Sequence, residues 1–176
     1  RIEAWRARLP RAGVPRIGLV WSGKPSHKND YNRSIAFAGL APLLAQPGVA
    51  FVSLQRDIRD ADLAELEKYP ALLRPDQALA DFADTAALVG ELDLVIAVDT
   101  AVARLAGTLG KPVWILLPFC PDWRWLLDRD DSPWYPTARL FRQPRIGDWD
   151  SVIARLGQEL GQELALLATA QRAAAP

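Results

Sequence analysis

Short, continuously apolar segments alternate along this chain with segments whose apolar residues recur at helical intervals. The apolar segments are 16–23, 49–55, 94–98, 112–117 and 139–142. Strands that are apolar on both faces are typical of a parallel sheet covered by helices on both sides. The helical segments are 35–46, 60–69, 81–93, 101–109 and 149–167. This alternation predicts an α/β fold with a doubly wound, Rossmann-like parallel sheet.

The same pattern sets the expected domain boundaries. Residues 1–15 predict a short amphipathic lead-in or linker, because two prolines and a glycine interrupt its second half. Residues 16–167 form the predicted domain, and 168–176 (ATAQRAAAP) a frayed tail. The segment 71–80 stays ambiguous, with a short strand at 72–73 as one interpretation.

Two helix boundaries carry specific signals. Asp81 precedes the helix expected over 81–93 and is a good N-cap, since its carboxylate can accept from a free backbone N–H. Gly110 follows the helix expected over 101–109 and fits the left-handed position at a helix C-terminus.

Composition excludes several classes of protein. The 176 residues fit one domain, and 21 basic side chains balance 21 acidic ones, so the basic field of a general nucleic-acid binder is missing. A single cysteine excludes an internal disulfide. No apolar run reaches the roughly 20 residues of a membrane helix. With no signal peptide at the N-terminus, these features favour a cytoplasmic location.

The chain starts at Arg1 and contains no methionine. We therefore expect it to be a piece of a longer protein, which carries further parts of whatever activity it supports.

Topology alone predicts where a ligand would bind. If the strand order is 3-2-1-4-5-6, the strands at 16–23 and 94–98 are neighbours at the point where the order reverses. Ligands of such sheets bind beyond the carboxyl ends of the strands at that point. The segments that follow, 24–34 (KPSHKNDYNRS) and 99–107 (DTAVARLAG), should therefore face each other across one crevice.

These two segments carry complementary chemistry. The polar side chains of the first are Lys24, His27, Lys28, Asn32, Arg33 and Ser34. The second brings Asp99, Thr100 and the free N–H groups that open the next helix. Cations opposite a helix N-terminus make an anion site, most simply for a phosphate or diphosphate. The alternatives are a solvated surface loop for the first segment and ordinary helix capping for the second.

The sequence does not support several other well-known kinds of nucleotide, catalytic or metal site. Neither G-x-G-x-x-G nor G-x-x-x-x-G-K-[ST] is present, which argues against a dinucleotide-dependent dehydrogenase and a P-loop nucleotidase. His27 is the single histidine, so no Ser-His-Asp triad or multi-histidine metal site can form. A metal site in the acidic run 128–136 is disfavoured, and Cys120 reads as a structural or incidental thiol. Altogether we expect neither a metal nor a cofactor.

The tryptophan-rich segment 118–137 allows two interpretations. Trp123, Trp125 and Trp134 can stack on a base or a sugar ring. They can also pack the loop against the domain, or dock against another domain, and packing or docking is favoured.

Several blocks of the sequence resemble a known family. They are RIGLVWSGKPSHKNDYNRSI, FVSLQ, DFADTAALVGELDLVIAVDTAVARLAGTLGKPVWILLP and PDWRWLLDRDDSPWYPTARLFRQP. They resemble bacterial proteins in which tetratricopeptide repeats precede a glycosyltransferase-like region. They are similar in turn to the C-terminal domain of heptosyltransferase-type (family 9) glycosyltransferases, and more distantly to O-linked N-acetylglucosamine transferases. The most specific block is D-T-x-x-x-x-L-A-G-x-L-G-x-P at 99–112.

The resemblance implies one half of a GT-B fold, the half that grips a nucleotide-diphospho-sugar donor without a metal. Asp99 and Thr100 would hold the diphosphate, and Arg33 would neutralise it with Lys24 and Ser22 nearby. Gln55 would lie towards the ribose or base. The partner implied is an N-terminal domain, with tetratricopeptide repeats as an option, and the catalytic base is expected there.

The chain departs from the family pattern at one position. The family has a histidine five residues after the aspartate, where this chain has Arg104. Arginine can bind phosphate bidentately, so donor binding can persist. The change also fits a non-catalytic nucleotide-binding or protein-docking module of a tetratricopeptide-repeat protein. A weaker third hypothesis is an unrelated doubly wound enzyme such as a nucleotide-sugar epimerase.

Overall fold

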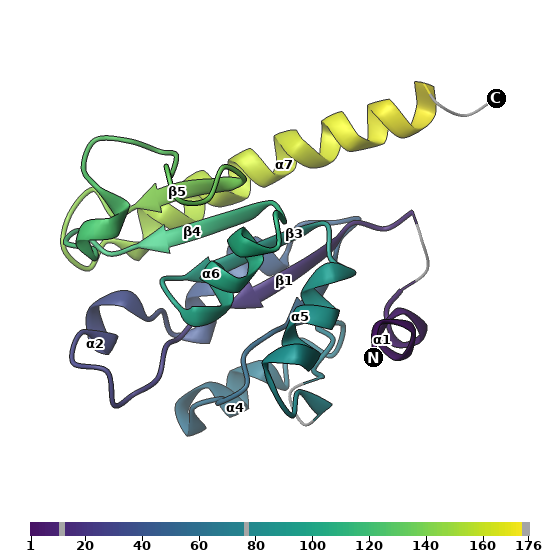
Figure 1. The fold of residues 1–176 in the computed structure, drawn as a ribbon, viewed down its shortest axis with the longest axis horizontal. Coiled ribbons are helices and arrows are strands. Elements are labelled where there is room, and N and C mark those ends of the chain that lie inside the picture. Colours follow the sequence, from purple (N-terminus) through teal and green to yellow (C-terminus); the bar gives the residue numbers. More distant parts are fainter. Residues whose placement is uncertain (11–12, 76–77, 174–176) are drawn as a thin grey trace.

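The computed structural model describes residues 1–10, 13–75 and 78–173 (Figure 1). Within them, five parallel strands form one sheet in the order β2-β1-β3-β4-β5. The strands are β1 (Arg16–Val20), β2 (Ala50–Ser53), β3 (Leu94–Val98), β4 (Val113–Leu117) and β5 (Ala138–Arg142). The predicted Rossmann-like, doubly wound α/β fold is thus confirmed.

The sheet has a rudimentary sixth member beside β2. Leu73 forms a parallel bridge with Val52, and its N–H and carbonyl bond Phe51 and Ser53 across 3.0 and 2.8 Å. When this bridge is counted as the third strand, the order becomes the predicted 3-2-1-4-5-6. The crevice therefore opens between β1 and β3, as topology requires.

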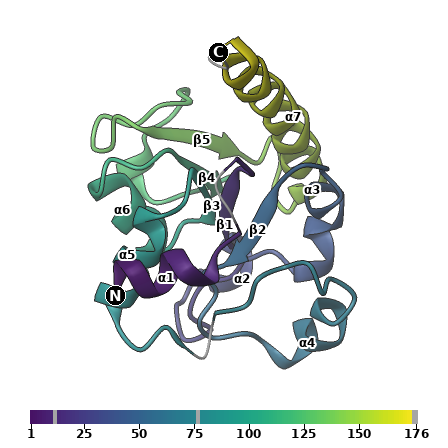
Figure 2. The ribbon, with the colours of Figure 1, turned by 90° about the vertical axis from the view of Figure 1, so that its right-hand side faces the viewer.

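Helices cover both faces of the sheet (Figure 2). One face packs against η1 (Phe37–Leu40), α3 (Ala41–Leu44), α4 (Asp60–Leu66) and α7 (Trp149–Ala173). The other packs against α1 (Ile2–Arg8), α5 (Phe82–Gly90) and α6 (Ala101–Thr108). Two further helical turns are α2 (Asp30–Arg33) and η3 (Trp123–Trp125).

The strands feed two separate cores because their side chains alternate between the faces. In β3, Ile96 and Val98 join the first core, whereas Val95 and Ala97 join the second. Burial on both faces explains why the strands are apolar throughout.

The helix predicted over 35–46 is broken in two. Pro42 has no N–H to bond the carbonyl of Ala38, which accepts instead from Ala41. The chain consequently forms the 3-10 turn η1 before the α-helical turn α3.

Both ends of the chain differ from expectation. The lead-in is no free linker, because Trp5 of α1 is 5% exposed and lies in the second core. Arg6 adds a bidentate contact to Glu91, with both hydrogen bonds 2.8 Å long. At the other end, α7 continues past residue 167 to Ala173 (Figure 1), and 174–176 lie outside the described residues. The absence of Gly and Pro from 165–173 permits this extension.

Candidate functional site

The carboxyl ends of β1, β2 and β3 border a pocket of about 560 Å³, here called the inner pocket. Its lining includes Ser22, Lys24, Arg33, Gln55 and Thr100, all predicted from the sequence as site residues. The other lining residues are Val20, Gly23, Leu54, Arg56, Asp57, Asp81, Phe82, Thr85, Ala101 and Val102.

A second pocket of about 330 Å³, here called the outer pocket, shares Arg33 and Thr100 with the inner one. It also contains the two remaining predicted residues, Asp99 and Arg104. The rest of its lining is His27, Asn29, Pro121, Asp122 and Arg124. The structure therefore brings together the segments after β1 and β3, as the topology predicted.

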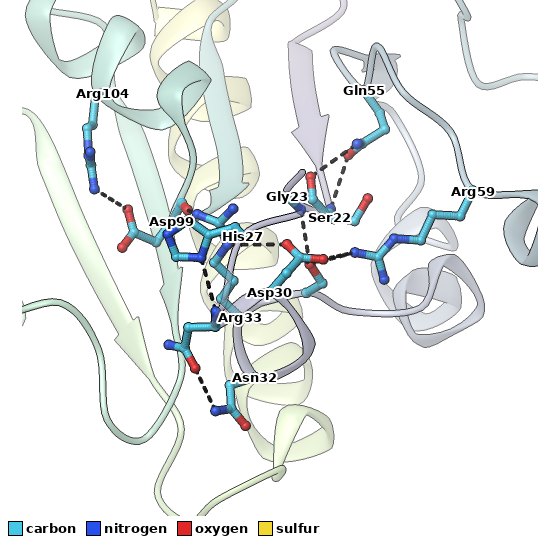
Figure 3. A network of polar contacts seen from close by, with 12 residues as sticks. Ser22, Gly23, His27, Asp30, Asn32, Arg33, Gln55, Arg59, Asp99 and Arg104 are labelled. Atoms are coloured by element: carbon cyan, nitrogen blue, oxygen red, sulfur yellow. Dashed lines mark hydrogen bonds and ion pairs between the residues drawn. The ribbon is translucent and has the colours of Figure 1, made fainter. Parts of the chain in front are cut away.

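Asp30 anchors the segment after β1. Its buried carboxylate accepts hydrogen bonds from the side chains of Arg33 and Ser34 at 3.3 and 3.0 Å, and pairs with Arg59 (Figure 3). Ser34 Oγ in turn accepts from the N–H of Gly23 at 3.0 Å. These contacts involve the helical turn α2, within the segment 24–34 for which a solvated loop was one interpretation.

Arg33 spans the crevice from this anchored turn. Its Nη1 donates a 2.7 Å hydrogen bond to the backbone carbonyl of Asp99 at the end of β3. The guanidinium lies directly over Gly23, where a Cβ would be 2.3 Å from Nη2. Glycine at position 23 thus creates the space that lets the cation reach the beginning of α6.

Gln55 has a positioning role that the sequence did not reveal. Its Oε1 accepts from the N–H groups of Trp21 and Ser22 at 3.2 and 3.1 Å. Its Nε2 donates to the carbonyls of Ser22 and Asp57, both at 3.1 Å. All four hydrogen-bonding capacities of the amide are therefore used by the backbone. Gln55 holds the ends of β1 and β2 together at the pocket wall.

Two buried hydroxyl groups at the pocket have no hydrogen-bond partner among the described residues. They are Ser22 Oγ and Thr100 Oγ1. Ser22 as a whole residue is 2% exposed. A buried hydroxyl without a partner is costly, and such groups in native proteins call for an explanation. A ligand in the inner pocket would supply acceptors for both.

The N-terminus of α6 adds donors to the same place. Thr100 is the N-cap and makes no side-chain capping bond. The first backbone N–H groups of the helix therefore keep their capacity to bind an anion, and the helix dipole favours negative charge there.

Asp99 holds cations in place. Its carboxylate, which can only accept hydrogen bonds when ionised, pairs with Arg104 Nη2 at 3.1 Å. Its carbonyl holds Arg33. Arg104 is thereby fixed at the outer pocket, beside the beginning of α6.

The outer pocket also contains an ion pair, Asp122 with Arg124, in which both pKa values are shifted. Burial opposes ionisation of Asp122, but hydrogen bonds from the Arg124 N–H and guanidinium hold the pKa of the carboxyl below its usual value. The same hydrogen bond and charge raise the pKa of Arg124. The pair therefore stays ionised at neutral pH.

Two cations at the inner pocket have no ion-pair partner in the described part of the chain, Lys24 and Arg56. Arg56 and the exposed ring of Phe82 are site residues that the sequence analysis missed. Arg56 directly follows Gln55 after the second strand, a position that could have identified it. Conversely, Lys28 and Asn32 line neither pocket, and Asn32 instead bonds Asn29 within the turn at 2.6 Å.

The other candidates from the sequence line neither pocket. Two of them contact Arg124 of the outer pocket, because its guanidinium lies over the Trp123 ring and its carbonyl accepts from Trp134 Nε1 at 3.1 Å. Trp125 is buried in the second core, as packing predicts, whereas Trp123 and Trp134 are exposed. Asp131 and Asp130 pair with Arg129 and Arg155. No cluster of three or more metal-ligating side chains occurs in the part of the chain that the structure describes.

No helix among the described residues combines the length and apolarity needed to cross a membrane.

Comparison with known proteins finds a relative but gives no family assignment. No protein-family model matches the chain. It is similar to Protein FlbA of Caulobacter vibrioides, with 31% identity over 165 residues. The alignment covers 91% of this chain but 27% of the relative, so the chain spans about a quarter of the protein that it matches.

Proposed function

We propose that this chain is the nucleotide-diphospho-sugar binding domain of a metal-independent GT-B glycosyltransferase. The observation that carries the proposal is the convergence, among the described residues, of buried, unpartnered hydroxyls and cations without ion-pair partners on the inner pocket. Ser22 Oγ and Thr100 Oγ1 are buried without partners. Lys24 and Arg56 line the same pocket without ion-pair partners among the described residues, beside the beginning of α6. Together these groups match a phosphorylated ligand.

The shape of the pocket supports a nucleotide in particular. At about 560 Å³ it falls in the size range of small-molecule sites. Phe82 and Val102 give part of its wall an apolar surface, on which a base or ribose can lie. The resemblance of the 99–112 block to family 9 glycosyltransferases supports a sugar attached to the diphosphate.

Catalysis in this proposal is electrostatic. Negative charge builds on the diphosphate as the bond to the sugar breaks, and donors already fixed around α6 stabilise it. Arg33 and Arg104 are held by Asp99, so they need little rearrangement. The base that deprotonates the acceptor hydroxyl lies on a second domain in this scheme, and the isolated chain binds the donor without transferring the sugar.

Calorimetric titration with UDP, ADP and GDP tests the proposal. Lys24→Ala and Arg56→Ala should each weaken binding of the preferred nucleotide about tenfold, since each removes a charged contact. Lys28→Ala is the matched control, because this exposed lysine lies on the same loop but lines neither pocket. No binding of any nucleotide, or equal losses in all three variants, would refute the donor-site proposal.

A protein-docking module is the second candidate. It is favoured by three large apolar side chains on the segment after β4: Trp123, Leu127 and Trp134 are 73%, 73% and 58% exposed. Their substitution by serine would then leave nucleotide titrations unchanged and abolish association with the proposed second domain, measured by co-purification of the two separate domains.

A further inference from the structure

The outer pocket differs in chemistry from the inner one, although the two meet at Arg33 and Thr100. The inner pocket has apolar walls at Phe82 and Val102, whereas Pro121 is the one non-polar residue among those that line the outer pocket. A nucleotide with its base in the inner pocket would pass the beginning of α6 and present its far end to the outer pocket. The outer pocket thus suits a small, charged group.

The charges of the outer pocket favour an anion. Three guanidinium groups, those of Arg33, Arg104 and Arg124, line it against two carboxylates, Asp99 and Asp122. Both carboxylates are already occupied by arginines, at 3.1 and 2.8 Å. Arginine carries five N–H donors, so each keeps donors beyond those that its carboxylate uses.

His27 adds an N–H donor to this pocket. The backbone N–H of Asn29 donates to His27 Nδ1 across 3.2 Å. A nitrogen that accepts a hydrogen bond carries no proton, so Nε2 is the ring nitrogen that carries the N–H. In Figure 3 His27 lies beside Asp99, with Arg104 on the other side of that carboxylate, in keeping with their shared place in the outer pocket.

We infer that the outer pocket binds the terminal phosphate of a nucleoside diphosphate and that His27 Nε2–H donates to it. The inference rests on the proposed function. It identifies His27 as the residue that makes the site bind a nucleoside diphosphate more tightly than the matching monophosphate. His27 would reinforce the arginines and orient the phosphate oxygen from which the sugar departs. His27 lies just before the turn α2, and its carbonyl accepts from the N–H of Asp30 at 2.9 Å, which keeps the donor in position.

The test is to compare nucleoside diphosphate with the matching monophosphate, titrated against the same chain by calorimetry. His27→Asn is the informative variant. An asparagine oxygen can accept from the N–H two residues on, so the bond to Asn29 is kept and only the Nε2 donor is lost. His27→Ala removes both the hydrogen bond from the Asn29 N–H and the Nε2 donor. Thermal unfolding of the two variants shows whether either substitution destabilises the loop.

We expect His27→Asn to weaken diphosphate binding about tenfold and to leave monophosphate binding within twofold of the original. Equal affinities of variant and original for the diphosphate would overturn the inference, as would equal losses for both nucleotides. These results would leave the proposed function standing, because the original chain would still bind. No binding of UDP, ADP, GDP or their monophosphates by the original chain would instead refute the proposed function and the inference built on it.

Discussion

Arg33 Nη1 donates a 2.7 Å hydrogen bond to the backbone carbonyl oxygen of Asp99, a residue 66 positions away along the chain. This contact joins the segment after β1 to the end of β3, where the helix α6 begins. It places a cation at the boundary between the inner and outer pockets.

Gly23→Ala should displace this cation. The new Cβ would lie 2.3 Å from Arg33 Nη2 and 2.5 Å from Asp30 Oδ1, so both side chains must shift. We expect nucleoside diphosphate binding to fall at least tenfold in calorimetric titration, since a misplaced charged donor loses roughly 1.5 kcal/mol or more. Gly90→Ala is the control, because a Cβ there meets nothing within 4 Å. Unchanged binding in Gly23→Ala would show that Arg33 does not contact the ligand.

Ser22→Ala should weaken nucleotide binding without lowering the stability of the fold. The Ser22 hydroxyl is buried without a partner, so its removal should leave the free energy of unfolding unchanged or raise it by up to about 1 kcal/mol. The same change should weaken nucleotide binding about fivefold, because the ligand loses one donor.

Ser53→Ala is the matched control for that experiment, since Ser53 Oγ is buried but accepts from the N–H of Gln55. It should lower the free energy of unfolding by about 1 kcal/mol in urea denaturation. A Ser22→Ala protein that is less stable, or that binds as tightly as the original, would contradict the role given to Ser22.

Gln55→Leu should destabilise the domain. The leucine is similar in size but leaves the N–H groups of Trp21 and Ser22 and the carbonyl of Ser22 without their partner. Leaving several buried backbone groups unpaired should cost about 3 kcal/mol, measured as a lower midpoint in urea denaturation. A loss under 1 kcal/mol would mean that the ends of β1 and β2 are held together by other contacts.

Substitutions at Arg104 distinguish a functional donor site from one that has lost catalysis. Arg104→Ala should weaken nucleoside diphosphate binding about tenfold, as a phosphate contact is lost. In a protein that joins this domain to the proposed second domain, Arg104→His should not increase sugar transfer if arginine is the functional residue here. A gain of transferase activity on Arg104→His would instead indicate a site that has lost catalysis.

Acid should weaken the beginning of α5. Asp81 accepts from the N–H of Asp84 at 2.8 Å, and this bond, followed by the hydrogen bond from Arg1, lowers the pKa of the carboxyl. A carboxylate whose pKa in the folded protein lies below its unfolded value of about 3.9 stabilises the fold at neutral pH. This stabilisation is lost as the pH falls through the pKa of the folded state, because the carboxylate is then protonated.

Asp81→Asn keeps the capping oxygen but does not titrate, so its Tm should change less than that of the original between pH 5 and pH 2. Parallel curves for the two proteins in thermal unfolding across this range of roughly three pH units would argue against a titrating cap.

The sequence by itself determined the sheet and the place of its crevice. Strands that are buried on both faces must be apolar at every position, and this reads directly from segments such as 94–98. The N-cap at Asp81 and the positive φ of Gly110 were also predictable, because local backbone geometry dictates them.

Only the tertiary structure decided how the polar residues divide their roles. Gln55 and Asp99 carry the same groups whether they bind a ligand or the backbone, and the contacts across the crevice assign both to positioning. Arg56 and Phe82 become site residues because the end of β2 and the beginning of α5 lie beside that crevice. Helix α1 joined the domain through Trp5, a contact with a distant helix that no local pattern encodes. Periodicity records which side of a segment is buried, whereas the partner on that side depends on how the whole chain packs.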